Sequence, residues 1–263
     1  MSRRRRIAEE PVSRLAIWAR RFAFFALAVA LLAVVVVQSG FIEPVPGLIT
    51  FVGSLVIAGF AMLLSFGAFI VIWNDGLKGF GYALFALAVG VALIAYPAYL
   101  GARSYGKPPL NDISTDTDDP PRFEAIARLR PRTANPVAYP GAKAVELQQK
   151  MYPDLEPLQL TATPQEAYDA ALEVITRRKW LAIDTRSPLG GRRDGRIEAV
   201  ARTPIMGFRD DVVVRVRPSS GGARVDVRSA ARYGTYDFGT NARRVRALLD
   251  DIDDAVGSQP ARR

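Results

Sequence analysis

Three apolar runs in the first hundred residues constrain the fold of this chain most strongly. They cover residues 22–37, 48–73 and 80–100, and the second and third contain no charged residue. The first is the shortest and is extended by apolar residues around the Arg20-Arg21 pair. A helix needs roughly 20 apolar residues to cross a bilayer. Each run is therefore predicted to be a transmembrane helix; the alternative, helices buried in a soluble core, fits this length and lack of charge poorly.

Basic residues gather before the first run and predict how the helices insert. Seven arginines precede it: Arg3, Arg4, Arg5, Arg6, Arg14, Arg20 and Arg21. The first loop contains Glu43 and no basic residue, and the second contains Lys78. Basic segments stay in the cytoplasm. We therefore predict a multi-pass protein of the cell inner membrane, with a cytoplasmic N-terminus and a periplasmic C-terminal part.

Two other interpretations of the N-terminus fit less well. Arg20-Arg21 before an apolar run resembles a twin-arginine export signal, and such a start also resembles a cleaved signal peptide. However, the run is long for a signal peptide, residues 38–47 contain no Ala-x-Ala site, and two more spans follow. A nucleic-acid patch is an alternative for the arginines at residues 3–6, but beside a span they are expected to set topology and contact anionic lipid.

The chain contains no cysteine and no histidine. This excludes disulfides, thiol nucleophiles, Ser-His-Asp triads and every metal site with Cys or His ligands. The predicted spans contain no acid, base or amide that would mark a transport path, so a channel or pump is not expected. We expect no cofactor and no metal, and no residue is assigned as catalytic.

Residues 101–160 are charged and proline-rich. They contain nine of the chain's 18 prolines, which exclude long helices, although a helix over residues 142–151 is predicted. Phe123 and Ile126 are among the apolar anchors of this arm, so we interpret the arm as lying on the folded domain. A disordered stalk is the alternative.

The C-terminal part opens on a helix-start signal, Thr163-Pro164-Gln165-Glu166. Its N-cap threonine, its proline at the first helical position and its glutamate at the third form the capping-box pattern. Four segments with strand character follow, and a second helix ends the domain. The strands are predicted over residues 180–185, 196–203, 211–217 and 223–229. Valine alternates there with charged residues, which predicts an antiparallel sheet with one face on helices and the other in water.

The predicted fold class is thus an α-helical transmembrane segment of three spans followed by an α+β domain, with an antiparallel sheet of about four to five strands and two packed helices. The predicted organisation is a basic N-terminus (residues 1–21), the spans (22–100), a proline-rich arm (101–160), the α+β domain (161–257) and a tail (258–263).

The register between the last two strands decides which charges meet. Valine must lie beside valine, so the numbers of paired residues sum to 439 or 441. A sum of 439 places Asp211 opposite Arg228 with a four-residue loop, and 441 places Arg215 opposite Asp226 with a longer loop. The sequence favours neither. Both place Asp211 and Arg228 on one face, with about 5 to 8 Å between Cβ atoms.

Several motifs resemble a known family. They read LNDISTD from residue 110, YPDLEPL from 152, GFRDDV from 207, VDVRSAARYG from 225, DFG from 237 and NARRV from 241. Over residues 110–255 the chain resembles the bacterial and plant family catalogued as domain of unknown function 1499 (DUF1499). Many members carry Cys where this chain has Asp112 and Ser where it has Ala231, so no thiol role carries over. The resemblance implies no established activity.

The last helix is charged against its own dipole. Arginines crowd its start and aspartates crowd its end, whereas a helix start favours acids. In one hypothesis, arginines converge beside the free N–H groups of this start and hold a phosphate, a carboxylate or a lipid head group. In the other, aspartates neutralise these arginines in an internal ion-pair network. The residues concerned are Asp210, Asp211, Arg228, Arg232, Asp237, Asn241, Arg243 and Arg244.

Catalysis has little support in the sequence. Asp210 and Asp211 are adjacent, so in a strand they point to opposite faces and cannot act as a pair. Interspersed charge and the predicted location also argue against nucleic-acid binding. The favoured hypothesis is a domain that binds an anionic ligand or membrane lipid. The alternatives are a structural accessory subunit with an envelope protein partner and, less favoured, an enzyme that uses Asp and Arg.

Overall fold

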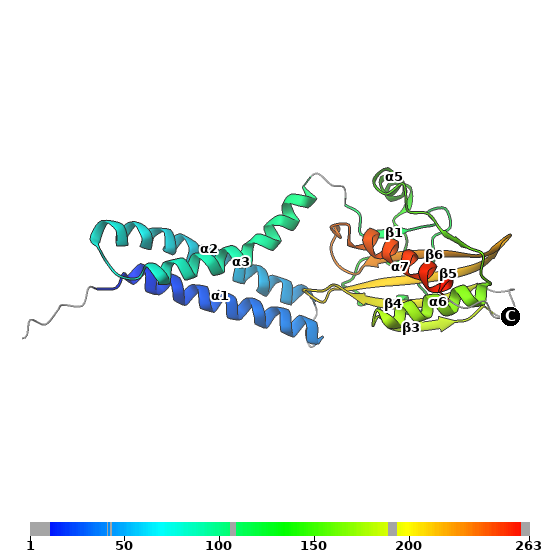
Figure 1. The fold of residues 1–263 in the computed structure, drawn as a ribbon, viewed down its shortest axis with the longest axis horizontal. Coiled ribbons are helices and arrows are strands. Elements are labelled where there is room, and N and C mark those ends of the chain that lie inside the picture. The colour runs from blue at the N-terminus through cyan, green and yellow to red at the C-terminus, as the bar shows by residue number, and fades with distance from the viewer. Residues whose placement is uncertain (1–10, 41, 43, 106–108, 189–193, 259–263) are drawn as a thin grey trace, which may run out of the picture. The chain divides into compact units, whose positions relative to one another are not determined.

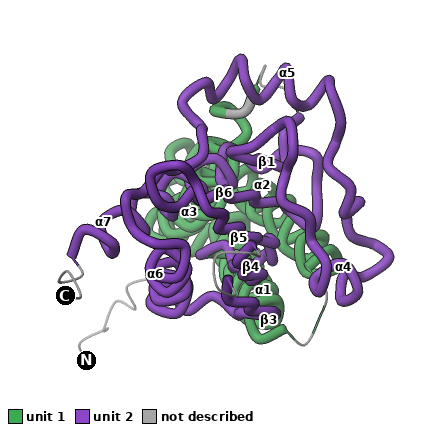
Figure 2. The backbone as a smooth tube through the Cα atoms, turned by 90° about the vertical axis from the view of Figure 1, so that its right-hand side faces the viewer, with its two compact units in different colours: residues 1–105, 205–207 green, residues 106–204, 208–263 purple. Residues whose placement is uncertain are grey.

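The computed structural model describes residues 11–40, 42, 44–105, 109–188 and 194–258. It divides into two compact units (Figure 2). The helical unit comprises residues 1–105 with 205–207, and the sheet unit comprises residues 106–204 with 208–263. The arginines at residues 3–6 and Glu43, on which part of the topology prediction depends, lie outside the described residues.

Three helices form the helical unit (Figure 1): α1 Arg14–Ser39, α2 Pro44–Asp75 and α3 Phe80–Ser104. Each is long and apolar enough to cross a membrane, which confirms the three predicted helices. The first begins earlier than the apolar run because Ser13 caps it, with its side chain accepting a hydrogen bond from Ala16 N at 3.5 Å. Arg20 and Arg21 therefore lie inside α1.

Small side chains allow these helices to pack closely. The buried residues of α1 recur every three or four positions and are mostly alanines: Ala16, Ala19, Ala23, Ala26, Ala30 and Ala33. Gly90 lies against α2, since a Cβ added there would be 2.3 Å from Met62 Cγ. Small residues at such contacts bring helix backbones together in lipid, where there is no hydrophobic drive for association.

Among the described residues, six strands form one antiparallel sheet in the order β1-β6-β5-β4-β3, and β2 also pairs with β6. They are β1 Asp112–Ser114, β2 Leu158–Leu160, β3 Leu181–Arg186, β4 Gly195–Arg202, β5 Arg209–Ser219 and β6 Gly222–Ala231. The four predicted strands are confirmed as β3 to β6. The other two come from the arm and have three residues each, too few to show an alternating pattern.

In the β5–β6 hairpin the numbers of paired residues sum to 441, which places Arg215 opposite Asp226 and Asp211 opposite Ala230. The longer loop expected for this register is wrong, because pairing continues to Ser219 and Gly222 and leaves a two-residue turn. Gly222 has φ 145°, and a Cβ there would lie 2.2 Å from the Leu160 carbonyl oxygen. A glycine is therefore required where β2 meets the turn.

In the described part of the sheet unit there are also four helices: α4 Ala125–Leu129, α5 Gly141–Met151, α6 Pro164–Arg177 and α7 Thr240–Gly257. The capping box of α6 is confirmed. Thr163 Oγ1 accepts a hydrogen bond from Glu166 N at 3.3 Å, and Glu166 Oε2 accepts one from Thr163 N at 2.9 Å. The predicted helix over residues 142–151 is α5.

The sheet has helices on both faces, with α6 and α7 on one and α4 on the other (Figure 2). Val212 and Val214 belong to the core beneath α6 and α7, as predicted. The opposite face was expected in water, but Val213 is fully buried there with Phe123 and Ile126 of the arm. That expectation was wrong because the arm supplies apolar cover that strand alternation alone does not reveal.

Candidate functional site

The start of α7 is closed by a carboxylate from its own chain. Asp237 Oδ1 accepts a hydrogen bond from Gly239 N at 2.9 Å, and Oδ2 accepts one from Asn241 N at 2.7 Å. Burial raises the pKa of Asp237, although these two bonds oppose the shift. Two N–H groups on which the anion-site hypothesis relied are therefore already bonded.

Arg244 joins α7 to the sheet beneath it. Its Nη2 lies 2.5 Å from Asp210 Oδ2, and its Nη1 donates to Ser229 Oγ at 3.0 Å and to Asn241 Oδ1. The Ser229 hydroxyl also donates to Asn241 Oδ1 at 2.7 Å. All four residues are buried. Burial raises the pKa of Asp210, and the Arg244 guanidinium opposes this shift.

Arg232 and Arg130 hold Asp211 on the opposite face of the sheet, under the arm. Arg232 Nη2 lies 2.7 Å from Asp211 Oδ1, and Arg130 Nε lies 2.6 Å from Asp211 Oδ2. Arg130 Nη1 also donates to the carbonyls of Asn135 and Pro136. Arg130 was not among the predicted site residues because it comes from the arm, 81 residues from its partner.

Arg228 lies on the same arm-covered face and is 2% exposed. Its Nε and Nη2 donate to the two Asp112 carboxylate oxygens at 2.9 and 2.7 Å, a bidentate pair. Its guanidinium lies 4.7 Å from the Phe123 ring centroid and 5.1 Å from that of Tyr139. Burial raises the pKa of Asp112, and Arg228 opposes the shift. Asp112 is thus the ion-pair partner of Arg228.

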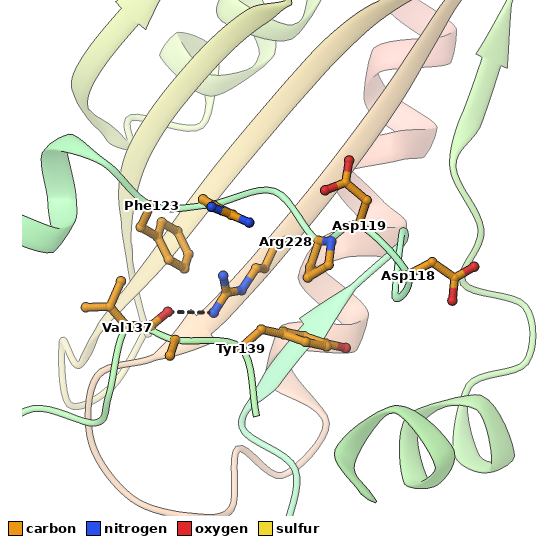
Figure 3. Close-up of a pocket in the computed structure, with 9 residues that line it drawn as sticks. Asp118, Asp119, Phe123, Val137, Tyr139 and Arg228 are labelled. Carbon is orange, nitrogen blue, oxygen red and sulfur yellow. Dashed lines mark hydrogen bonds between the residues drawn. The ribbon is translucent and has the colours of Figure 1, made fainter. Parts of the chain in front are cut away.

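A pocket of about 430 Å³ opens over Arg228 (Figure 3). Phe123, Val137 and Tyr139 surround the guanidinium, and Asp119 lines the pocket farther from it. The Arg228 side chain is largely satisfied, because it also donates to the carbonyls of Pro121 at 3.1 Å and Val137 at 2.9 Å. Burial raises the pKa of Tyr139 to about 12. Arg228 itself therefore offers an incoming anion little free hydrogen-bonding capacity, whereas Arg122, which also lines the pocket, forms no ion pair with any described residue.

The predicted site residues therefore do not meet in one basin. Asp210 meets Arg244 between the sheet and α7, whereas Asp211, Arg228 and Arg232 lie under the arm. The separation follows from the adjacency of the two aspartates in one strand, which sends their side chains to opposite faces. The remaining residues of the set are at the start of α7: Asp237, Asn241 and Arg243.

Sequence reasoning missed a third ion-pair cluster on the arm-covered face. Arg215, near its centre, pairs with Asp226 at 3.0 Å and with Asp116 at 3.2 Å. The other members are Arg217, Arg224 and Asp119. The sequence did contain a signal for part of this cluster, since the 441 register places Arg215 opposite Asp226. The two arm aspartates carried no such signal, because only the fold brings them to the strands.

A second pocket, of about 360 Å³, has a different composition, and we call it the Trp180 pocket. Half of its ten lining residues are basic and the others are apolar: Leu129, Arg178, Lys179, Trp180, Leu181, Ile183, Val200, Arg202, Arg209 and Arg232. Arg178 pairs with Asp251 at 2.8 Å, and Arg232 pairs with Asp211. Lys179 and Arg209 form no ion pair with any described residue. Sequence reasoning assigned Lys179 only to the basic end of α6.

The family model described as "Protein of unknown function (DUF1499)" matches residues 112–252. The chain belongs to this family. The match covers more than half of the 263 residues and confirms the resemblance read from the motifs. A search of the curated proteins found no match.

The DUF1499 segment begins in β1 and ends in α7, so it lies within the sheet unit. It contains all eight predicted site residues and both pockets. Within the described residues, no group of three or more His, Cys, Asp or Glu side chains could hold a metal ion. The Trp180 pocket of this segment sets basic side chains beside apolar ones.

Proposed function

We propose that this protein is a multi-pass protein of the cell inner membrane whose periplasmic sheet unit binds an anionic membrane lipid. The observation that carries the proposal is the composition of the Trp180 pocket, where cationic side chains border apolar ones and no lining residue is acidic. A charged head group would meet the cations, and part of its hydrocarbon would lie on the apolar wall.

The Trp180 pocket differs from the other arginine sites because two of its cationic side chains have no carboxylate partner in the described part of the chain. Arg228, Arg232 and Arg244 each have a carboxylate partner within 2.7 Å. Lys179 and Arg209 have none among the described residues. The apolar wall adds to binding, because each buried CH₂ group contributes roughly 0.8 kcal/mol. A ligand with both a negative head and an apolar chain uses both properties.

The helical unit supports the proposed topology. Ser13 N donates to the Lys78 carbonyl at 2.8 Å, and Lys78 N donates to the Pro11 carbonyl at 3.1 Å. The segment just before Arg14 and Lys78 thus share one end of the unit, which the positive-inside rule favours in the cytoplasm. Three crossings then carry the rest of the chain to the periplasm. A reporter fused after Arg263 tests this, and a cytoplasmic signal would overturn the orientation.

Lipid binding is tested with the full chain purified in mild detergent and titrated with lysophosphatidylglycerol. We expect saturable binding that changes tryptophan fluorescence, because Trp180 lines the pocket. The double variant Lys179→Gln, Arg209→Gln should weaken binding about fivefold per removed charge. Lys150→Gln, which removes an exposed charge from α5, is the matched control and should leave affinity unchanged.

Two results would contradict this proposal. One is the absence of saturable binding by the unaltered protein. The other is equal weakening by the double variant and by Lys150→Gln, which would indicate general attraction to net charge. Lysophosphatidylcholine is the ligand control, since it carries the same chain on a head group with no net charge.

A structural accessory subunit is the second proposal, favoured by the internal pairing of buried charges such as Arg228 with Asp112. Such pairing makes a rigid unit without requiring a ligand. A stoichiometric protein partner that copurifies while lysolipid binding is absent would support this role. Turnover in a substrate screen would support the less favoured Asp/Arg enzyme.

A further inference from the structure

Two arginines lie well inside the first transmembrane helix. Arg20 and Arg21 are six and seven residues beyond the first residue of α1, which places them about 9 to 10.5 Å along the helix. The rest of the helix beyond them is apolar up to Gln38. Charged residues within a span are rare and usually face a partner. The identity of that partner is therefore a specific question for this chain.

Aromatic rings orient both guanidinium groups. The Arg20 Cζ lies 3.9 Å from the ring centroid of Tyr82, which belongs to α3, and the Arg21 Cζ lies 5.0 Å from that of Trp18. A ring face attracts a cation without using its N–H donors. The donors of both groups stay available for an acceptor outside the helices.

The described part of the helical unit supplies no carboxylate to these arginines. Among the described positions of this unit, Asp75 is the only acidic residue. Neither Arg20 nor Arg21 forms an ion pair with Asp75 or with any other described residue. With no carboxylate partner among the described residues, the lipid head group is a source of negative charge for these arginines in the bilayer. An anionic head group is favoured over a zwitterionic one because it brings no positive charge of its own.

The outer surface of α1 suits such a lipid. Arg14, Trp18, Arg21 and Phe25 follow one another at steps of four, three and four residues, so they share one helix face. All four are exposed, with Trp18 at 50% and Phe25 at 57%. From the start of the helix this face alternates cations with aromatic side chains, and it ends in Phe25, on the side where acyl chains begin.

We propose that Arg20 and Arg21, oriented by Tyr82 and Trp18, form a binding site for the phosphate of an anionic phospholipid in the leaflet at the N-terminal end of α1. The site is separate from the Trp180 pocket, which lies in the other unit. It does not depend on the function proposed for that pocket.

The test uses the full chain reconstituted in phosphatidylcholine vesicles with spin-labelled lipids as probes. Spin-labelled phosphatidylglycerol should associate more strongly than spin-labelled phosphatidylcholine. The double variant Arg20→Gln, Arg21→Gln should lose this preference by about fivefold per arginine. Arg103→Gln removes a cation from the last turn of α3 and should keep the preference, which makes it the matched control.

A second pair of variants keeps every charge. These variants test the site even if the arginine double variant inserts poorly into the vesicles. Tyr82→Leu removes the ring beneath Arg20 and should reduce the preference for phosphatidylglycerol. Tyr82→Phe keeps the ring and should retain that preference. The proposal is overturned if the unaltered chain associates equally with both lipids, or if Tyr82→Leu and the arginine double variant both bind phosphatidylglycerol like the unaltered chain.

Discussion

Arg244 on α7 and Asp210 on β5 form a buried ion pair, with 2.5 Å between Nη2 and Oδ2. This pair explains how a helix with an arginine-rich start is stable. The unfavourable interaction of a cation with a helix start is roughly 0.3 to 1 kcal/mol when exposed, and a buried carboxylate partner offsets it. Arg246 also has a carboxylate partner, although an exposed one, since its Nη2 lies 2.7 Å from Asp154 Oδ1. At the other end of α7, Arg178 pairs with Asp251.

Removing one member of this pair should strongly destabilise the sheet unit. Arg244→Gln leaves the Asp210 carboxylate buried without a charged partner, and we expect a loss of about 3 to 5 kcal/mol in the free energy of unfolding. Chemical denaturation of the full chain in detergent measures it. Arg243→Gln is the control: this neighbouring side chain is exposed and should cost less than about 0.5 kcal/mol. Equal losses from the two variants would contradict the structural role of Arg244.

The pairing of Arg228 with Asp112 predicts a rescue. Arg228→Leu alone leaves Asp112 buried and unpaired, and should destabilise by about 3 to 5 kcal/mol. Adding Asp112→Asn should recover part of that loss, because a neutral amide is less costly to bury than a carboxylate. A double-mutant cycle from denaturation midpoints measures the coupling. Additive losses would show that the two side chains do not act as a pair.

Glu198 should hold the arm on the sheet. It is fully buried on β4 and accepts hydrogen bonds from Glu124 N at 2.7 Å, Ala125 N at 3.2 Å and Ile126 N at 2.8 Å. Glu198→Gln replaces one acceptor oxygen by a donor, so stability should fall by about 1 to 3 kcal/mol. Amide hydrogen exchange should rise selectively over α4. Unchanged exchange there would argue against this anchoring role.

Acid should weaken the arm through Asp116. Burial alone would raise the pKa of Asp116, but the Asp119 backbone N–H and the guanidinium groups of Arg224, Arg215 and Arg217 together lower it. Because the folded pKa is below the unfolded value, this contribution is present above about pH 4 and is lost as pH falls through the folded pKa. Unfolding free energies between pH 5 and 2 should fall less steeply for Asp116→Asn than for the unaltered chain. If the unfolding free energy depends on pH in the same way in both proteins, Asp116 does not contribute to the loss of stability in acid.

The hairpin turn requires glycine at one position and tolerates a side chain at the next. Gly222→Ala should lower stability by about 1 to 3 kcal/mol, because φ is 145° and the new Cβ would meet the Leu160 carbonyl oxygen. Gly221→Ala is the matched control, since no heavy atom lies within 4 Å of a Cβ there. Thermal melts of both variants measure the two losses of stability. A larger loss from Gly221→Ala would contradict the structure of the turn.

Local patterns accounted for most of the elements that were predicted. The capping residues Thr163 and Glu166 and the alternating valines of β5 and β6 carry their signals within a few neighbouring residues. The strands β1 and β2 were missed because three-residue strands contain no period. Register was undecided because both sums satisfy the valine pattern, and the structure selects 441 by extending the pairing to Ser219 and Gly222.

The sequence by itself determined three apolar helices, an antiparallel α+β domain and membership of the DUF1499 family, because periodicity, length and motif spacing are local properties. Only the tertiary structure decided which charges meet. Arg244 finds its acid 34 residues away, Arg246 finds one 92 residues away and Arg228 finds one 116 residues away. Those pairings depend on how the arm and α7 cover opposite faces of the sheet. Whether an arginine is neutralised or available is therefore a property of the packed fold.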